Sequence, residues 1–271
     1  MKALSCLLII LCVSCGDDNF RKVDRLVGFR VLAILADAPE VAPGGTVNLQ
    51  LFVSDPQGAG RTVTAATASC VDPGVSVGAT VSCDHDPTRV SGSYAVDTST
   101  PDFVSNLRTG LAAPLSVTVP ATILQNRSPR EQFNGVSYIV IFDFEVDGER
   151  LRTFKRIIAT NRGTLNTNPS GSVLLKNNLP FDGTLRKDDG LSVTGTGVES
   201  NDYLNIDGSQ ESRLEQIDVS WYVSHGELDR PKTFLGEETE YQDTPPDSTM
   251  LLVSIIRDDR GGVEVMREVI P

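Results

Sequence analysis

The sequence has few of the residues on which catalytic sites depend. It contains two histidines, His85 and His225, and no H-E-x-x-H, Walker, G-x-G-x-x-G or G-x-S-x-G motif. A Ser-His-Asp device needs a histidine beside a nucleophile and a carboxylate. His85 lies between two aspartates and His225 directly precedes a glycine, so we expect both to be solvated loop residues. We therefore predict that the chain is not an enzyme and assign no catalytic residue.

Positive charge is also scarce. The chain has 24 lysines and arginines against 36 aspartates and glutamates, a net charge of -12. Because an acidic surface repels phosphates, we expect no nucleic-acid partner. The recurring residues are Val, Thr, Ser, Gly, Asp and Pro, which are typical of strands and turns. A hydrophobic content of 39% is enough for a core, so the chain is not expected to be disordered.

No apolar run is long enough to cross a bilayer, which takes about 20 residues. The longest, Leu4 to Val13, follows Lys2 and has the length of a secretory signal. It ends at Ser14-Cys15-Gly16, which resembles the bacterial lipobox, although Cys12 stands where Leu, Val or Ile is usual. The sequence thus predicts a lipoprotein signal over residues 1–14 and lipidation of Cys15.

Several acyl chains on one residue would hold the protein at a membrane, since each buried CH₂ contributes about 0.8 kcal/mol. The predicted partner at this end is therefore the lipid bilayer, reached through acylated Cys15. Gly16 in place of aspartate favours the outer membrane by analogy with enterobacteria. An ordinary cleaved signal with an incidental cysteine is the alternative.

Alternating apolar and polar residues predict an all-β ectodomain. Thr46 to Ser54 alternates with a period of two, as in a half-buried strand. We expect two tandem immunoglobulin-like β-sandwich domains with one short helix. The proposed boundaries are a tether at 15–27, a first domain at 28–162, a linker at 163–171 and a second domain at 172–271.

Local signals refine this division. Ser128-Pro129-Arg130-Glu131 matches a capping box with proline at the first helical position, and Gly135 ends the turn. A hairpin is expected from Val136–Val146 to Leu151–Thr160 through Asp147-Gly148. The segment 84–113 is expected to be loops with one or two edge strands. Other expected strands cover 30–36, 46–54, 62–70, 115–119, 172–175, 191–195, 216–224, 250–257 and 263–269.

Cys70 and Cys83 are the two cysteines of the body. In an exported chain a disulfide is their default state, and the loop they close is worth about 3 kcal/mol. A metal site with Asp84 and His85 is the alternative, but a structural zinc needs four N or S ligands. We predict the disulfide and no metal site.

Acidic clusters could in principle hold calcium or hydrolyse glycosides. None has the order of an EF-hand loop, so we expect solvated turns and no cofactor, with calcium in loop carboxylates left open. The clusters are Asp182, Asp188 and Asp189, then Asp202 and Asp207, then Glu237, Glu238 and Glu240.

Both ends of the ectodomain resemble uncharacterised predicted lipoproteins of myxobacteria and related bacteria. The residues that carry the resemblance are 30–34, 39–44, Asp55-Pro56, Lys155-Arg156, 166–169, 220–226, Pro245-Pro246 and 257–263. The resemblance implies an exported, anchored chain with immunoglobulin-like domains, and no activity.

Three functions remain. The first is a non-catalytic binding or structural module for an envelope protein or glycan. The second is a scaffold or accessory subunit of an envelope assembly or secretion system. The third, a carboxylate-dependent hydrolase, needs two carboxylates that converge in one pocket about 5–9.5 Å apart.

Overall fold

The regular structure of the described residues is nearly all β, with one short helix, as the composition predicts. The computed structural model describes residues 24–58, 60–74, 80–104 and 107–271. The predicted signal, Cys15 and most of the predicted tether lie outside these described residues. The immunoglobulin-like topology and the division into two domains stay predictions.

Residues 30–159 form two sheets that face each other. The first has the order β1-β3-β7-β6, and β8 also pairs with β3. The second has the order β2-β10-β9-β4-β5. Bounds in the first sheet are β1 Arg30–Ala36, β3 Thr46–Ser54, β6 Phe103–Val104, β7 Thr109–Leu111 and β8 Leu115–Thr118. Bounds in the second are β2 Glu40–Val41, β4 Thr62–Val71, β5 Val90–Asp97, β9 Val136–Val146 and β10 Glu149–Ala159.

The hairpin of β9 and β10 forms as expected. Its turn residues Asp147 and Gly148 both have positive φ, 55° and 78°, which suits the twist of flanking strands. The alternation of β3 is also confirmed, because Val47, Leu49 and Leu51 are fully buried between the two sheets. The segment 84–113 is more regular than expected, since it contains β5, β6 and β7.

Residues 173–270 form a second pair of sheets. One has the order β12-β11-β13-β18 and the other β17-β16-β19-β20. Their bounds are β11 Val173–Lys176, β12 Leu179–Pro180, β13 Gly190–Thr194, β16 Ile217–Val223, β17 Lys232–Phe234, β18 Thr239–Glu240, β19 Met250–Asp258 and β20 Val263–Ile270. Trp221 of β16 is fully buried in this core, and its indole N–H donates to Thr233 Oγ1 at 2.9 Å. The expectation that Trp221 lies on a core strand is confirmed.

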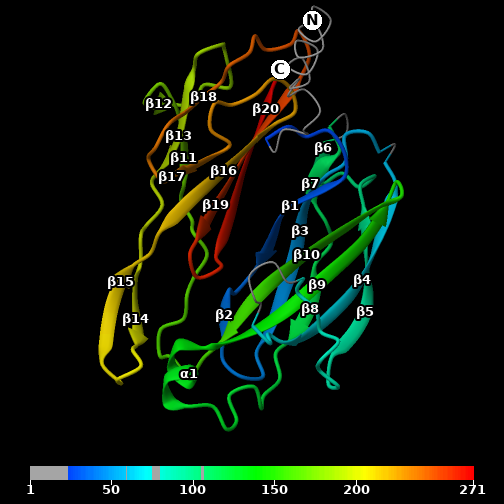
Figure 1. The fold of residues 1–271 in the computed structure, drawn as a ribbon. Helices are drawn as coiled ribbons and strands as arrows, with labels where there is room; N and C mark the ends of the chain where they lie inside the picture. Colours follow the sequence, from blue (N-terminus) through cyan, green and yellow to red (C-terminus); the bar gives the residue numbers. More distant parts are fainter. Residues whose placement is uncertain (1–23, 59, 75–79, 105–106) are drawn as a thin grey trace, which may run out of the picture.

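The two pairs of sheets pack against each other through β19. This strand is apolar on both faces, as strands buried in the middle of a protein are. Met250, Leu252 and Ile256 enter the second core. The side chains between them, Leu251 and its odd-numbered neighbours, join a third cluster with Leu32 and Phe52 of the first half. The four sheets are thus stacked, with β19 and β20 against β1 (Figure 1).

The residues just before β1 contact the second half of the chain and not the first, which was not expected from the sequence. Arg25 forms a parallel bridge with Val223 at the end of β16, and the buried Asp24 carboxylate accepts from the Leu228 N–H at 3.0 Å. The last part of the predicted tether is therefore fixed to the second half of the chain.

Candidate functional site

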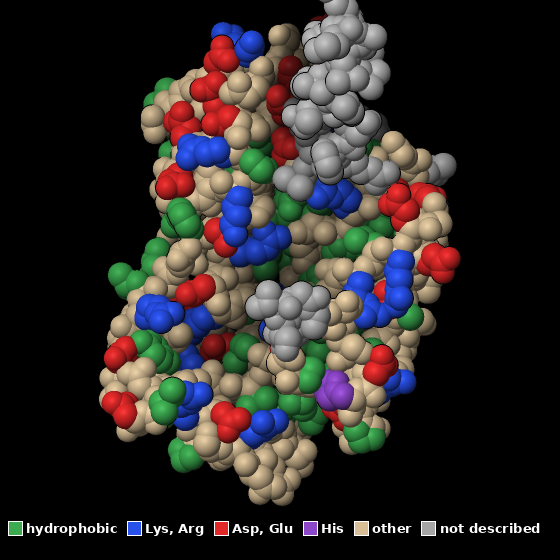
Figure 2. Space-filling view, viewed as in Figure 1, with side chains coloured by type: hydrophobic (Ala, Val, Ile, Leu, Met, Phe, Trp, Pro, Cys, Tyr) green, Lys and Arg blue, Asp and Glu red, His purple; other side chains and the backbone are tan. Residues whose placement is uncertain are grey.

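A cleft opens at the junction of the two halves. It lies between the helix α1 (Pro129–Asn134), the hairpin of β14 (Ser200–Leu204) and β15 (Gln210–Leu214), and the turn from β19 to β20. Its volume is about 250 Å³. Basic and acidic side chains are interleaved over this region in the lower left of Figure 2. The lining residues are Asn134, Arg162, Asn201, Tyr203, Arg213, Leu214, Glu215, Asp259 and Arg260.

The helix fixes the hairpin in place. The predicted capping box is present: Ser128 Oγ accepts from the Glu131 N–H, and the Glu131 carboxylate accepts from the Ser128 N–H at 2.9 Å. The helix ends at Asn134, whose amide pairs with both backbone groups of Leu204, at 2.7 and 2.8 Å. Two hydrogen bonds between the end of the helix and β14 therefore hold the hairpin in place.

Arg162 forms one wall of the cleft. Its guanidinium lies 5.4 Å from the centre of the Phe133 ring and donates to the Phe133 carbonyl at 3.3 Å. It also donates to the Asn201 side-chain oxygen. The arginine, at the end of the predicted first domain, thus contacts both the helix and the hairpin.

Arg260 forms the opposite wall and is the centre of a charged cluster. Its guanidinium lies 2.7 Å from Glu215 and 2.9 Å from Glu199, at the base of the hairpin. It also lies 3.7 Å from Glu40 of β2, in the other half. Burial raises the pKa of Glu215, and the hydrogen bond from Arg260 opposes that rise. One buried cation therefore joins three carboxylates from three segments.

The turn that carries Arg260 is built around Asp258. Its carboxylate accepts from the N–H groups of Arg260 and Gly262, at 2.8 and 2.7 Å, and from the Asn166 amide at 3.1 Å. A Cβ on Gly262 would lie 2.1 Å from that carboxylate, so only glycine fits. Asn166 also donates its backbone N–H to Glu40 at 2.8 Å.

A buried lysine closes the far side of this turn. Lys155 of β10 is 7% exposed and donates to the Gly261 carbonyl. Burial lowers the pKa of Lys155 to about 8, although nearby Asp258 opposes the shift. The turn is thus held from the first half by Lys155 and Glu40.

The cleft can bind acidic or hydroxylated groups. Arg213 is exposed and lies 5.3 Å from the centre of the Tyr203 ring, whose hydroxyl it also contacts through a side-chain hydrogen bond. Guanidinium groups pair with carboxylates in a fixed two-bond geometry. The Asn134 amide and the Asn201 side-chain oxygen are already engaged, so the exposed Arg213 is the basic side chain that a ligand in the cleft would reach first.

The hairpin carries two exposed apolar residues beside the cleft. Ile206, at its tip, is 91% exposed and Leu214 is 70% exposed. The sequence analysis did not predict this hairpin, because Ser200–Leu214 is mostly polar. The signal that could have found it is Asp207-Gly208, where Gly208 has a φ of 85°.

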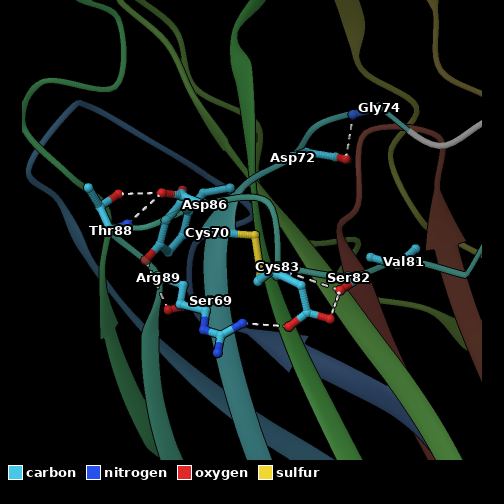
Figure 3. Close-up of a disulfide and its surroundings, with 12 residues drawn as sticks. Ser69, Cys70, Asp72, Gly74, Val81, Ser82, Cys83, Asp86, Thr88 and Arg89 are labelled. Atoms are coloured by element: carbon cyan, nitrogen blue, oxygen red, sulfur yellow. Dashed lines mark hydrogen bonds and ion pairs between the residues drawn. A yellow bond between two sulfur atoms is a disulfide. The ribbon is translucent and has the colours of Figure 1, made fainter.

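The predicted disulfide is present between Cys70 and Cys83 (Figure 3). The metal alternative for these cysteines is therefore wrong. Both cysteines are buried against Ile139 and Ile141, on the face of the second sheet that points away from the core. Directly after the disulfide, Arg89 pairs with Asp84 at 2.5 Å across the turn that leads to β5.

The histidines and acidic clusters lie apart from the cleft, except for Asp202 and Asp207 of the hairpin. His85 and His225 are exposed. Asp182 bonds to Lys176, and Asp189 bonds to Asn177, each within its own turn. Pairing of β13 with β18 brings Glu240 opposite Gly190. Among the described residues, no group of three or more His, Cys, Asp or Glu side chains is arranged to hold a metal ion.

A larger hollow of 490 Å³ lies near Phe29, Arg30 and Arg150. It borders Val27 and Gly28, only a few residues from the start of the described chain. The smaller cleft at the junction differs in that it borders the ion-pair cluster of Arg260, which joins both halves of the chain.

Comparisons with known proteins identify no family. No family model and no curated protein matches the chain. The chain is 11% identical to red sea bream transglutaminase, whose crystal structure aligns with a TM-score of 0.26. The alignment covers 89% of this chain and 31% of the transglutaminase chain. The sporulation control protein Spo0M from Bacillus subtilis is 11% identical, with a TM-score of 0.25, over 90% of each chain. The chain thus spans about a third of the transglutaminase. Within the described ranges, no helix has the length and apolar character needed to cross a membrane.

Proposed function

We propose that the protein is an exported, lipid-anchored module of the bacterial envelope that binds a partner through the cleft and its hairpin, without catalysing a reaction. The signal-like residues 1–14 and Cys15 support export and anchoring to the outer membrane. The Cys70–Cys83 disulfide is of the kind that persists in oxidising compartments outside the cytoplasm.

The observation that carries the proposal is the placement of the two ends of β16. The chain that follows Cys15 arrives at Val223, the last residue of β16. The hairpin leads into the first residue, Ile217, through Leu214. Seven extended residues span roughly 20 Å. The anchored end and the cleft thus lie at opposite ends of one buried strand, so the cleft faces away from the anchor.

A protein partner is favoured over a glycan by the hairpin tip. Ile206 at this tip is 91% exposed, and we propose that it inserts into an apolar pocket of the partner, as the anchors of protein interfaces do. Arg213 beside it would pair with an acidic side chain of the same partner. The expected partner surface is therefore an apolar pocket edged by carboxylates.

The binding proposal is tested by capture of envelope proteins on the purified chain. Ile206→Asp and Arg213→Glu should each reduce recovery of a specific partner by at least tenfold. Leu179→Asp is the matched control, because Leu179 is 67% exposed but lies on β12, outside the cleft. Capture that is absent, or equal in all variants, would refute the binding role.

The anchor is tested separately. Cys15→Ser should move the protein from the membrane fraction to the soluble fraction and abolish labelling with a radioactive fatty acid. A variant that stays in the membrane fraction would contradict lipidation at this residue.

A further inference from the structure

The outer edge of β5 is an exposed strand edge without the usual protection. One edge of β5 pairs with β4 without a bulge, from Thr62 opposite Asp97 to Ser69 opposite Val90. Among the described residues, no strand pairs with its other edge. An unpaired edge presents a row of N–H and C=O groups to which another strand can add. Natural proteins usually block such an edge with lysine, proline, a bulge or a covering segment.

The other long edges of this protein are blocked in these ways. β1 has a bulge between Val31 and Ala33, and Arg257 donates to its Leu32 carbonyl at 2.7 Å. β20 carries Glu264, Arg267 and Glu268 along its length. The edges of the hairpin are polar and charged, and the remaining edge strands are four residues or shorter.

β5 differs because it has no charge over seven residues. Val90–Val96 reads VSGSYAV, and its first charged side chain is Asp97 at the end. The side chains on its outer face are Ser91, Ser93 and Ala95, which are small and exposed. Among the long open edges of the described residues, β5 is the one without a charged side chain in its first seven positions.

Absence of charge selects one kind of occupant. In an antiparallel pair related by a two-fold axis, the residue of β5 at the axis lies opposite its own copy, and residues on one side of it lie opposite residues on the other side. A charge at the axis, or next to it, would then lie close to its own copy and repel it. A different partner could compensate a charge with one of opposite sign, so it would not require a neutral edge. We propose that β5 pairs antiparallel with β5 of a second copy, which joins two five-stranded sheets into one.

The geometry of such a pair is restricted. Side chains that lie opposite each other in a sheet point to the same face. The two-fold axis must therefore lie where one residue of β5 is directly opposite its own copy, and cannot fall between two consecutive residues of β5. Centred on Ser93, the pair places Ser93 opposite its copy and Ser91 opposite Ala95. The side chains on this face are small enough to meet without clashes. The interface is small, below about 1,200 Å², so the expected dimer is weak and reversible.

The test is a charge exchange at Ser93. Sedimentation of the purified full chain, from about 1 to about 300 μM, should show reversible dimers. Ser93→Asp and Ser93→Lys should each weaken the dimer at least tenfold, since each sets like charges across the axis. An equimolar mixture of the two variants should restore association to within threefold of the original.

The controls separate this pairing from general charge effects and from unfolding. Thr64→Asp and Thr64→Lys put the same charges on the same face, one strand away from the edge, and should leave the dimer unchanged. Ser93 is exposed and makes no core contact, so the urea midpoints of its variants should match the original. A protein that stays monomeric at every concentration overturns the proposal. So does a dimer that both Ser93 variants leave intact, or one that the mixture fails to restore.

Discussion

The cluster around Arg260 is expected to hold the two halves together, and its removal has a calculable cost. Arg260→Met keeps the apolar stem but removes the guanidinium that serves Glu215, Glu199 and Glu40. Removing one partner of a buried ion pair costs about 3–5 kcal/mol, because the remaining charge is left in a poor solvent. We predict that Arg260→Met lowers the free energy of unfolding by about 3 kcal/mol at neutral pH, at the lower end of that range.

The burial of the partners sets this magnitude. The Glu215 and Glu40 side chains are 3% and 2% exposed, so water cannot replace the lost cation. Glu199 is 42% exposed and is expected to contribute little. Glu40 also keeps Arg162, 4.0 Å away, and the N–H of Asn166 as a donor, so the loss of Arg260 affects Glu40 less than Glu215.

The cost should depend on pH. Because burial raises the pKa of Glu215 above its ordinary value of 4.5, its contribution to stability is fully present below 4.5 and is lost as the pH rises through the folded pKa. Removing Arg260 raises that pKa further, since a cation that favoured the charged form is gone. The variant should therefore lose less stability near about pH 5 than at neutral pH.

Urea unfolding at the two pH values measures both effects. Arg213→Met is the matched control, because this arginine is exposed and stacks on Tyr203, and its loss should cost under about 1 kcal/mol. The double variant Arg260→Met with Glu215→Gln should be more stable than the sum of the two single changes predicts. If Arg260→Met cost no more than the control, or the same amount at both pH values, the reasoning would be refuted.

Three further predictions concern other parts of the fold. Since burial lowers the pKa of Lys155 from 10.5 to about 8, its contribution is fully present above 10.5 and lost as the pH falls through 8. As the pH rises from 8 to 10.5, the free energy of unfolding of the original protein, measured with urea, should increase by up to about 3 kcal/mol relative to that of Lys155→Met. A difference between the two proteins that stays constant with pH would contradict the lowered pKa. Replacing Cys70 and Cys83 by serine should lower the free energy of unfolding by about 3 kcal/mol, and an unchanged urea midpoint would argue against this stabilisation. Asn134→Ala should speed hydrogen exchange of the Leu204 amide, and unaltered protection would show that the helix does not hold the hairpin.

Local signals predicted the parts of the fold that depend on neighbouring residues. The capping box of Ser128 and Glu131 specifies the helix because its donors and acceptors lie within one turn. The Asp147-Gly148 turn specifies the hairpin because few other residues accept positive φ at both positions. The disulfide followed from the cysteine count and the expected compartment, which are likewise readable without a structure.

The cleft could not be predicted in this way, because long-range packing assembles it. Glu40 and Arg260 are 220 positions apart and carry no mutual signal in one sequence. Arg162 stood at the end of the predicted first domain, where an arginine ordinarily faces water. The hairpin was missed because a two-stranded arm with polar faces has no apolar alternation to reveal it.

The two-sided burial of β19 implies that the two halves act as one body. A fragment that began at the predicted second domain would expose Leu251, Val253 and Ile255 together, a patch that invites aggregation. It would also lose the bridge from Arg25 to Val223, although Arg25 precedes the first half in sequence. Any pull on the chain before residue 24 therefore reaches β16 of the second half first. Because β16 pairs with β19 along its whole length, that load passes into the shared core and not through a flexible linker. The position of the cleft relative to Arg25, near the start of the described chain, is consequently set by the sheet itself.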